Sequence, residues 1–175
     1  AASDVYKRQD IPRSKVDIAF AGDLQAQCTA SNYTMRELGI PFAGVYGACS
    51  TMAETLGLAA VFAAGGMAER VLALTSSHFC AAERQFRTPL EYGAKRTPTA
   101  QWTATAAGAC LVRAHGGQGV PVLSVTFGRV QDFEVHDINN MGAAMMPAAA
   151  STLLRYFAAT NTRPQDFDAI FTGDL

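Results

Sequence analysis

Short, almost wholly apolar runs alternate with helix-like segments along this 175-residue chain. Such runs are typical of strands buried on both faces of a sheet, and the helices between them make the connections that parallel strands need. We expect strands at residues 16–21, 42–48, 70–76, 106–114, 120–127 and 167–172. The pattern predicts an α/β protein with a mostly parallel sheet covered by helices.

Three segments carry helix signals. Residues 29–38 form a short candidate helix that Gly39 and Pro41 stop. Residues 52–64 form a longer one, with an apolar face made of Met52, Leu56, Ala59, Ala60 and Ala63. Residues 145–159 form a third, with a face made of Met146, Ala149, Leu153, Leu154 and Phe157. The polar, charged stretch at 77–101 interrupts the alternation, and we expect an irregular excursion there, where functional residues often lie.

Charge and cysteine usage exclude several function classes. A net charge of -1 gives no electrostatic reason to bind nucleic acid. No apolar stretch reaches the ~18 residues that span a bilayer, so any membrane association is expected to be peripheral. Four cysteines, Cys28, Cys49, Cys80 and Cys110, lie far apart without a CxxC pair. This argues against a zinc site or a disulfide framework and favours a reducing compartment.

The two ends of the chain predict an internal fragment. Residues 1–9 are polar and without periodicity, and we interpret them as an adapter-derived tail. The last residues directly follow the apolar run at 167–172. We therefore expect the fold to be incomplete at both ends.

Cys49 follows the apolar run at 42–48 and directly precedes a predicted helix. Thr51 and Glu54 have the spacing of a capping box, with Thr51 as the N-cap. Unpaired N–H groups and the positive end of the helix dipole then favour the thiolate form of the sulfur. Such a setting suits an activated nucleophile or an anion site, whereas the alternative is a small buried hydrophobe. The residues alone leave these alternatives open.

Several motifs of this chain agree in order and spacing with a known family. Residues 44–51 (GVYGACST) resemble the nucleophile segment of thiolase-fold condensing enzymes. With the other motifs, residues 10–175 resemble the stage V sporulation protein AD family. The other motifs lie at residues 22–24, 38–41, 76–93, 98–103 and 139–144.

The resemblance implies a thiolase-like fold of two βαβαβαββ halves. Residues 10–119 would hold most of the first half and residues 120–175 the start of the second. It also implies a role in spore formation, with dipicolinic acid as the ligand and calcium possible beside it. The implied partners are membrane-embedded proteins of the same sporulation transport complex. The implied location is intracellular and peripheral to the inner membrane of the developing spore, and a homodimer is plausible.

The resemblance also allows an acyltransferase that uses Cys49 as a thioester nucleophile. Condensing enzymes need a base or donor, commonly a histidine, that faces the cysteine from the second half. In related enzymes this position falls on or near Gly173 here, and the chain's histidines lie elsewhere, at His78, His115 and His136. The sequence therefore favours a non-catalytic binder, with the acyltransferase as the alternative.

Around Cys49 we predict a ligand site that includes His78, Arg84, Arg87, Gln101 and Trp102. His78 is a candidate donor to an anion, or a residue that fixes its loop. Arg84 and Arg87 suit a dicarboxylate through paired hydrogen bonds, and surface pairing with nearby glutamates is the alternative. Trp102 could stack on a ring or fill a core or interface position. We expect no metal site and no cofactor.

Overall fold

The computed structural model describes residues 11–82, 86, 95, 98, 100, 102–116, 119–137 and 140–173. The chain divides into two compact units, Ala1–Val125 and Thr126–Leu175. Within the described ranges, no helix is both long enough and apolar enough to cross a membrane.

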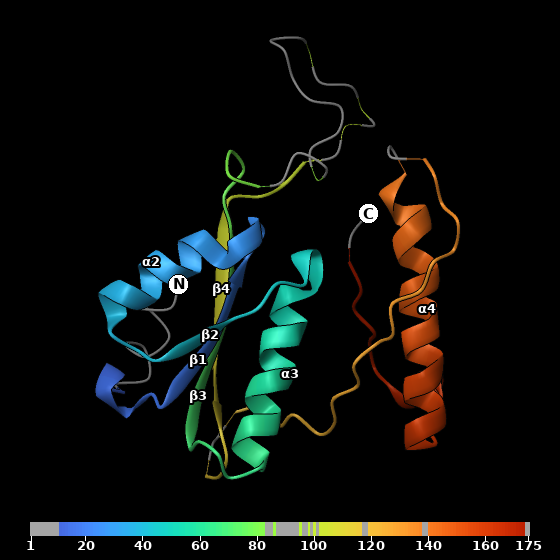
Figure 1. The fold of residues 1–175 in the computed structure, drawn as a ribbon. Helices are drawn as coiled ribbons and strands as arrows, with labels where there is room; N and C mark the ends of the chain where they lie inside the picture. The colour runs from blue at the N-terminus through green and yellow to red at the C-terminus, as the bar shows by residue number, and fades with distance from the viewer. Residues whose placement is uncertain are drawn as a thin grey trace. The chain divides into compact units, whose positions relative to one another are not determined.

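The first unit is built around a four-stranded sheet (Figure 1). The strands are β1 (Ile18–Asp23), β2 (Phe42–Gly44), β3 (Arg70–Ser77) and β4 (Ala106–Arg113), in the order β2-β1-β3-β4. β2 and β3 run parallel to β1, and β4 runs antiparallel to β3. The carboxyl ends of β1, β2 and β3 therefore meet at one edge of the sheet, where β4 begins. The predicted α/β class with a mostly parallel sheet is confirmed.

Two helices cover the sheet, α2 (Thr29–Leu38) on one face and α3 (Thr51–Ala64) on the other (Figure 1). Side chains alternate between the two faces of a strand. The core on the α2 side contains Val16, Ala19, Ala21, Met35, Ile40, Leu72 and Leu74. The core on the α3 side contains Phe20, Ala59, Ala63, Val71 and Ala73. Successive residues of β1 thus belong to different cores.

The two helices confirm the sequence boundaries to within one residue. α2 ends at the predicted position because Gly39 takes a left-handed φ of 64° and its N–H bonds to the Met35 carbonyl. The predicted apolar face of α3 is only partly right. Its fully buried stripe is Thr51, Thr55, Gly57, Ala59 and Ala63, while the larger Met52 and Leu56 are half-buried. Small side chains let the helix axis approach the sheet closely, which the apolar periodicity alone does not indicate.

The second unit contains α4 (Met141–Thr160), which begins four residues before the predicted start. Asn140 causes the early start, because its Oδ1 accepts a hydrogen bond of 3.1 Å from the Ala143 N–H. Two residues of the predicted apolar face, Met146 and Leu154, are 71% and 69% exposed. The aromatic rings that do pack together in this unit are those of Tyr156, Phe157 and Phe167, with centroids 5.9–6.0 Å apart.

Two predicted strands are wrong, those at residues 120–127 and 167–172. Both segments are described, and neither forms a strand. A strand needs a neighbour for its backbone N–H and C=O groups. In the described part of the chain, the only sheet is the four-stranded one made of β1, β2, β3 and β4. The composition of these segments suits a strand, but no strand pairs with them within the described residues. Within the described residues, short 3-10 turns also lie at Arg13–Lys15, Ala26–Cys28, Ala48–Ser50 and Pro164–Asp166.

Candidate functional site

The carboxyl edge of the sheet places Cys49 at the start of α3. β2 ends at Gly44, earlier than the predicted strand at 42–48, and the last ladder bond to β1 among the described residues comes from Val45. The Val45 N–H bonds to the Ala21 carbonyl at 3.0 Å. The 3-10 turn at Ala48–Ser50 then leads directly into the helix. Cys49 is exposed, so the alternative of a small buried hydrophobe does not hold for it.

The predicted capping box is wrong. Thr51 is the first residue of α3, the N-cap is Ser50, and no side chain caps the helix. The hydroxyl of Thr51 instead points back into the turn. It accepts a hydrogen bond from the Gly47 N–H at 3.1 Å and donates one to the Ala48 carbonyl at 2.8 Å. The 3-10 turn moves the helix start by one residue, which takes the Thr51 hydroxyl out of the capping position.

The backbone of this turn is unusual at Ala48, whose φ is +49°. For a residue with a Cβ, a left-handed conformation costs roughly 1–2 kcal/mol, so the surroundings must hold it. Gly22 of β1 makes room for the turn. A Cβ at Gly22 would collide with the Val45 carbonyl oxygen and lie 2.5 Å from the Cγ2 of Thr51. The turn that carries Cys49 is therefore fitted closely to the end of β1.

Cys28 supplies the buried thiol of this region. Its Sγ donates to the Val45 carbonyl at 3.2 Å, and the residue is 7% exposed. Burial raises the pKa of the Cys28 thiol, and the negative charge of Asp23 raises it further. The two cysteines therefore differ in kind: Cys28 is a protected neutral thiol, and Cys49 is accessible.

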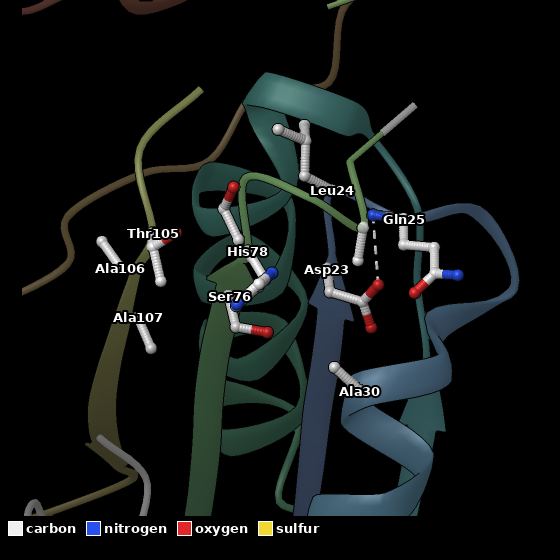
Figure 2. A pocket seen from close by; sticks show the side chains of 11 residues that line it. Asp23, Leu24, Gln25, Ala30, Ser76, His78, Thr105, Ala106 and Ala107 are labelled. Atoms are coloured by element: carbon white, nitrogen blue, oxygen red, sulfur yellow. Dashed lines mark hydrogen bonds between the residues drawn. The ribbon is translucent and has the colours of Figure 1, made fainter. Parts of the chain in front are cut away.

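A pocket of about 260 Å³ lies at the carboxyl ends of β1 and β3 (Figure 2). Its lining residues are Asp23, Leu24, Gln25, Ala30, Ser76, Ser77, His78, Ala81, Thr105, Ala106 and Ala107. His78, a predicted site residue, is among them. Cys49 is not, because the Asp23 carboxylate faces α2 whereas Gly22, beneath the Cys49 turn, faces α3. A joint role of Cys49 and His78 in one site stays a prediction.

Asp23 was not predicted as a site residue, and it organises the pocket wall. Its carboxylate accepts hydrogen bonds from the Gln25 N–H at 3.2 Å and from the Ser31 N–H and hydroxyl at 3.1 and 3.2 Å. Ser31 lies in the first turn of α2, so the negative charge of Asp23 also lies at the positive end of that helix dipole, which is favourable. The sequence signal was an aspartate that ends an apolar strand shortly before a helix.

Hydroxyl groups at the end of β3 and the start of β4 complete the polar lining. The Ser77 hydroxyl oxygen is buried and has no hydrogen-bond partner within the described part of the chain. The Thr105 hydroxyl accepts a hydrogen bond of 3.0 Å from the Phe79 N–H. Trp102 stacks on Phe79, with centroids 4.1 Å apart and an interplanar angle of 14°. The ring on which Trp102 stacks thus belongs to its own chain, to Phe79, the residue that follows His78.

Three predicted site residues, Arg84, Arg87 and Gln101, lie outside the described residues, and their roles stay predictions. Among the residues that the structure does describe, no group of three or more His, Cys, Asp or Glu side chains could hold a metal ion.

Comparison with known proteins decides the family. The model of the stage V sporulation protein AD (SpoVAD) family matches residues 1–175. The chain belongs to the SpoVAD family. It is 42% identical to stage V sporulation protein AD of Bacillus subtilis (strain 168) over 175 residues, which are 100% of this chain and 52% of that protein. The chain thus spans about half the length of this curated relative.

This chain is also similar to solved structures of other proteins. AbyA1, a tetronic acid condensing enzyme, matches with a TM-score of 0.64 at 16% identity, over 96% of this chain and 58% of that one. The 3-oxoacyl-[acyl-carrier-protein] synthase III of Aquifex aeolicus VF5 matches with a TM-score of 0.49 at 18% identity, over 67% of this chain and 37% of that one. The predicted thiolase-like fold is confirmed.

Proposed function

We propose that this SpoVAD-family chain belongs to a non-catalytic binder of dipicolinic acid that helps the uptake of this acid into the developing spore. Family membership across the whole chain supports the sporulation role. The observation that carries the binding role is the pocket at the carboxyl edge of β1 and β3, which holds His78 and a Ser77 hydroxyl that has no partner among the described residues. This edge is where open α/β sheets bind their ligands.

The lining of the pocket suits a carboxylate. A buried hydroxyl without a partner costs about 1–3 kcal/mol, and a carboxylate oxygen would accept its hydrogen bond. The Thr105 hydroxyl already accepts from the Phe79 N–H, so its own O–H is a second donor. His78 adds an imidazole at the same edge of the sheet. Two carboxylates on one pyridine ring would use such donors at once.

The charge of Asp23 must be balanced for a dianion to bind nearby. Asp23 is 2% exposed, and both of its carboxylate oxygens already accept hydrogen bonds, which partly stabilise its negative charge. Arg84 and Arg87 follow Ala81, a lining residue, closely in the sequence. We assign them the positive charge that a dicarboxylate needs.

The wider role rests on the family. We propose that the protein acts beside the membrane-embedded proteins of the same transport complex, intracellularly at the inner membrane of the developing spore. Calcium would accompany the ligand, and the protein would form a homodimer. Affinity capture of the tagged protein from sporulating cells tests the partnership. Recovery of no membrane protein above an untagged control would contradict it.

Titration calorimetry of the full-length protein with dipicolinate tests the binding role. We expect saturable binding that pyridine-2-carboxylate, with one carboxylate fewer, reproduces only weakly. Ser77→Ala should weaken it about fivefold, the factor given by a hydrogen bond of about 1 kcal/mol. Cys49→Ser separates the pocket from the wider site predicted around Cys49: because Cys49 lies outside the pocket lining, the pocket alone predicts wild-type binding for this variant. No saturable binding, or a loss in Cys49→Ser alone, would contradict the pocket assignment.

A second function, acyl transfer through a thioester on Cys49, is favoured by the exposure of Cys49 in a held turn at the start of α3. Incubation with acyl-CoA of several chain lengths and intact-mass measurement tests it. An acyl adduct that Cys49→Ser abolishes would support this function over the non-catalytic one. Its absence at every chain length would exclude it for those substrates.

A further inference from the structure

Two consecutive residues before α2 have a left-handed backbone, although neither is a glycine. Gln27 has a φ of 69° and Cys28 has a φ of 53°. Residues with a Cβ disfavour this conformation, so their surroundings must hold it, and residues held in this way are concentrated at ligand-binding and switch regions. The pair lies between Gln25 and Ala30, two residues that line the pocket at the carboxyl ends of β1 and β3 (Figure 2).

Asn32, an exposed residue of α2, bonds to both members of this pair. Its Nδ2 donates to the Cys28 carbonyl at 2.8 Å and to the Gln27 carbonyl at 3.3 Å. The Cys28 thiol adds its own bond to the Val45 carbonyl at 3.2 Å. A return of either residue to the right-handed region would reorient the carbonyls and break the bonds to Nδ2. One side chain therefore restrains the backbone of both residues.

The pocket wall is anchored on each side of the pair. The Leu24 N–H bonds to the Ser76 carbonyl at 3.0 Å, which fixes the end of β1 against β3. Ser31, in the first turn of α2, bonds to the buried Asp23 carboxylate through its N–H and its hydroxyl. The left-handed pair sets the path of the chain between these anchors. A change in that path would move the lining residues that lie between them.

We propose that Asn32 is a positioning residue of the pocket: by holding residues 27 and 28 left-handed, it sets the place of the wall that Gln25 and Ala30 form. Asn32 is not itself a lining residue and acts through the backbone. The effect on dipicolinate rests on the proposed function, whereas the hold on the pair does not depend on a ligand. When the pair relaxes, the wall changes shape and the Cys28 thiol loses its protected position.

Three variants of the full-length protein test this role. Asn32→Ala removes both bonds and leaves a good helix former. Thr34→Ala is the matched control, because Thr34 is also exposed on α2 and its hydroxyl also bonds to a carbonyl four residues earlier, that of Ala30, at 2.8 Å. Gln27→Gly added to Asn32→Ala tests the cause, because Gln27 is exposed and glycine enters the left-handed region freely. The readouts are the rate of Cys28 alkylation by iodoacetamide and the Kd for dipicolinate from calorimetry.

We expect Asn32→Ala to speed Cys28 alkylation and to raise the Kd for dipicolinate, each about fivefold, the factor that a hydrogen bond of about 1 kcal/mol gives. Thr34→Ala should behave as the wild type does. The added Gln27→Gly should reverse most of both changes, which a general loss of stability would not allow.

An unchanged Cys28 rate in Asn32→Ala would overturn the proposal, and so would equal effects in Thr34→Ala or no reversal by Gln27→Gly. A faster Cys28 reaction with an unchanged Kd would overturn the role of Asn32 in the pocket. If the wild type binds no dipicolinate, the proposed function fails and the pocket role fails with it. The Cys28 rate still decides in that case whether Asn32 holds the left-handed pair.

Discussion

Gly22 is the position where one added carbon should disturb the site most. In Gly22→Ala the new Cβ would collide with the Val45 carbonyl oxygen and lie 2.5 Å from the Cγ2 of Thr51, about 1 Å inside an ordinary carbon contact. The Val45 carbonyl belongs to the backbone, and Thr51 is fully buried, so neither neighbour moves cheaply. The turn that carries Cys49 must therefore shift away from β1.

The cost can be assembled from the contacts. Overpacking of a core costs about 1–3 kcal/mol. A shift of Val45 also weakens its bonds to the Ala21 carbonyl and the Cys28 thiol, at 3.0 and 3.2 Å, each worth about 1 kcal/mol. Against these losses, alanine stabilises a strand by about 0.5–1 kcal/mol relative to glycine, because it loses less conformational freedom on folding. We expect Gly22→Ala to lower the free energy of unfolding by about 3 kcal/mol.

Urea unfolding of the full-length protein, followed by circular dichroism, measures this loss. Gly108→Ala is the matched control, because Gly108 of β4 and Gly22 of β1 both pair with Thr75 of β3, from opposite sides. A Cβ at Gly108 meets nothing within 4 Å, so that variant should be neutral or slightly stabilised. A loss below about 0.5 kcal/mol in Gly22→Ala, or equal losses in both variants, would refute the close fit between β1 and the turn.

Three further predictions concern thiols and carboxylates. Because burial raises its pKa, the Cys28 thiol should stay unmodified by maleimide at neutral pH while Cys49 reacts, and equal rates would contradict this. The pKa of Asp17 lies below its ordinary value because the N–H groups of residues 69 and 70 bond to its Oδ2 at 2.8 Å. Its stabilising effect is therefore present above the unfolded pKa of about 4 and is lost as the pH falls through the folded value. Asp17→Asn should lower the free energy of unfolding at pH 7 and change it little near pH 2. A loss that does not vary with pH would contradict a stabilising role of the charged carboxylate. Asp23→Ala should lower the free energy of unfolding by about 2 kcal/mol, because the buried Ser31 N–H loses its acceptor. Asp23→Asn keeps an acceptor oxygen and should lower it less. Urea unfolding curves that coincide for the two variants would contradict this.

Local signals predicted both helices and two of the four strands of the first unit to within one residue, whereas β1 (Ile18–Asp23) lies two residues later than predicted and β2 ends at Gly44. α2 has its predicted bounds because the residue type at its end decides where it stops: Gly39 takes the left-handed φ of the C-cap, which glycine adopts readily. β3 and β4 match their apolar runs to within one residue at each end. The place of Cys49 at a helix start also followed from the order of strand, turn and helix, whereas its exposure was left open by the residues alone.

The failures have a common physical origin, because they depend on neighbours distant in sequence. The capping box failed because the 3-10 turn at Ala48–Ser50 took up the Thr51 hydroxyl. The segments at 120–127 and 167–172 have strand composition, but pairing is decided by a partner and not by composition. Asp23 and Ser77 became pocket residues only because β1 and β3 are neighbours in the sheet, which no local pattern shows.

The most direct test of dipicolinate binding is the crystal structure of the full-length protein with dipicolinate. We predict electron density for the ligand at the carboxyl ends of β1 and β3, with a carboxylate oxygen within hydrogen-bond distance of the Ser77 hydroxyl and the ring near His78. Ligand density only elsewhere, or none at a concentration that saturates the calorimetric signal, would contradict the account.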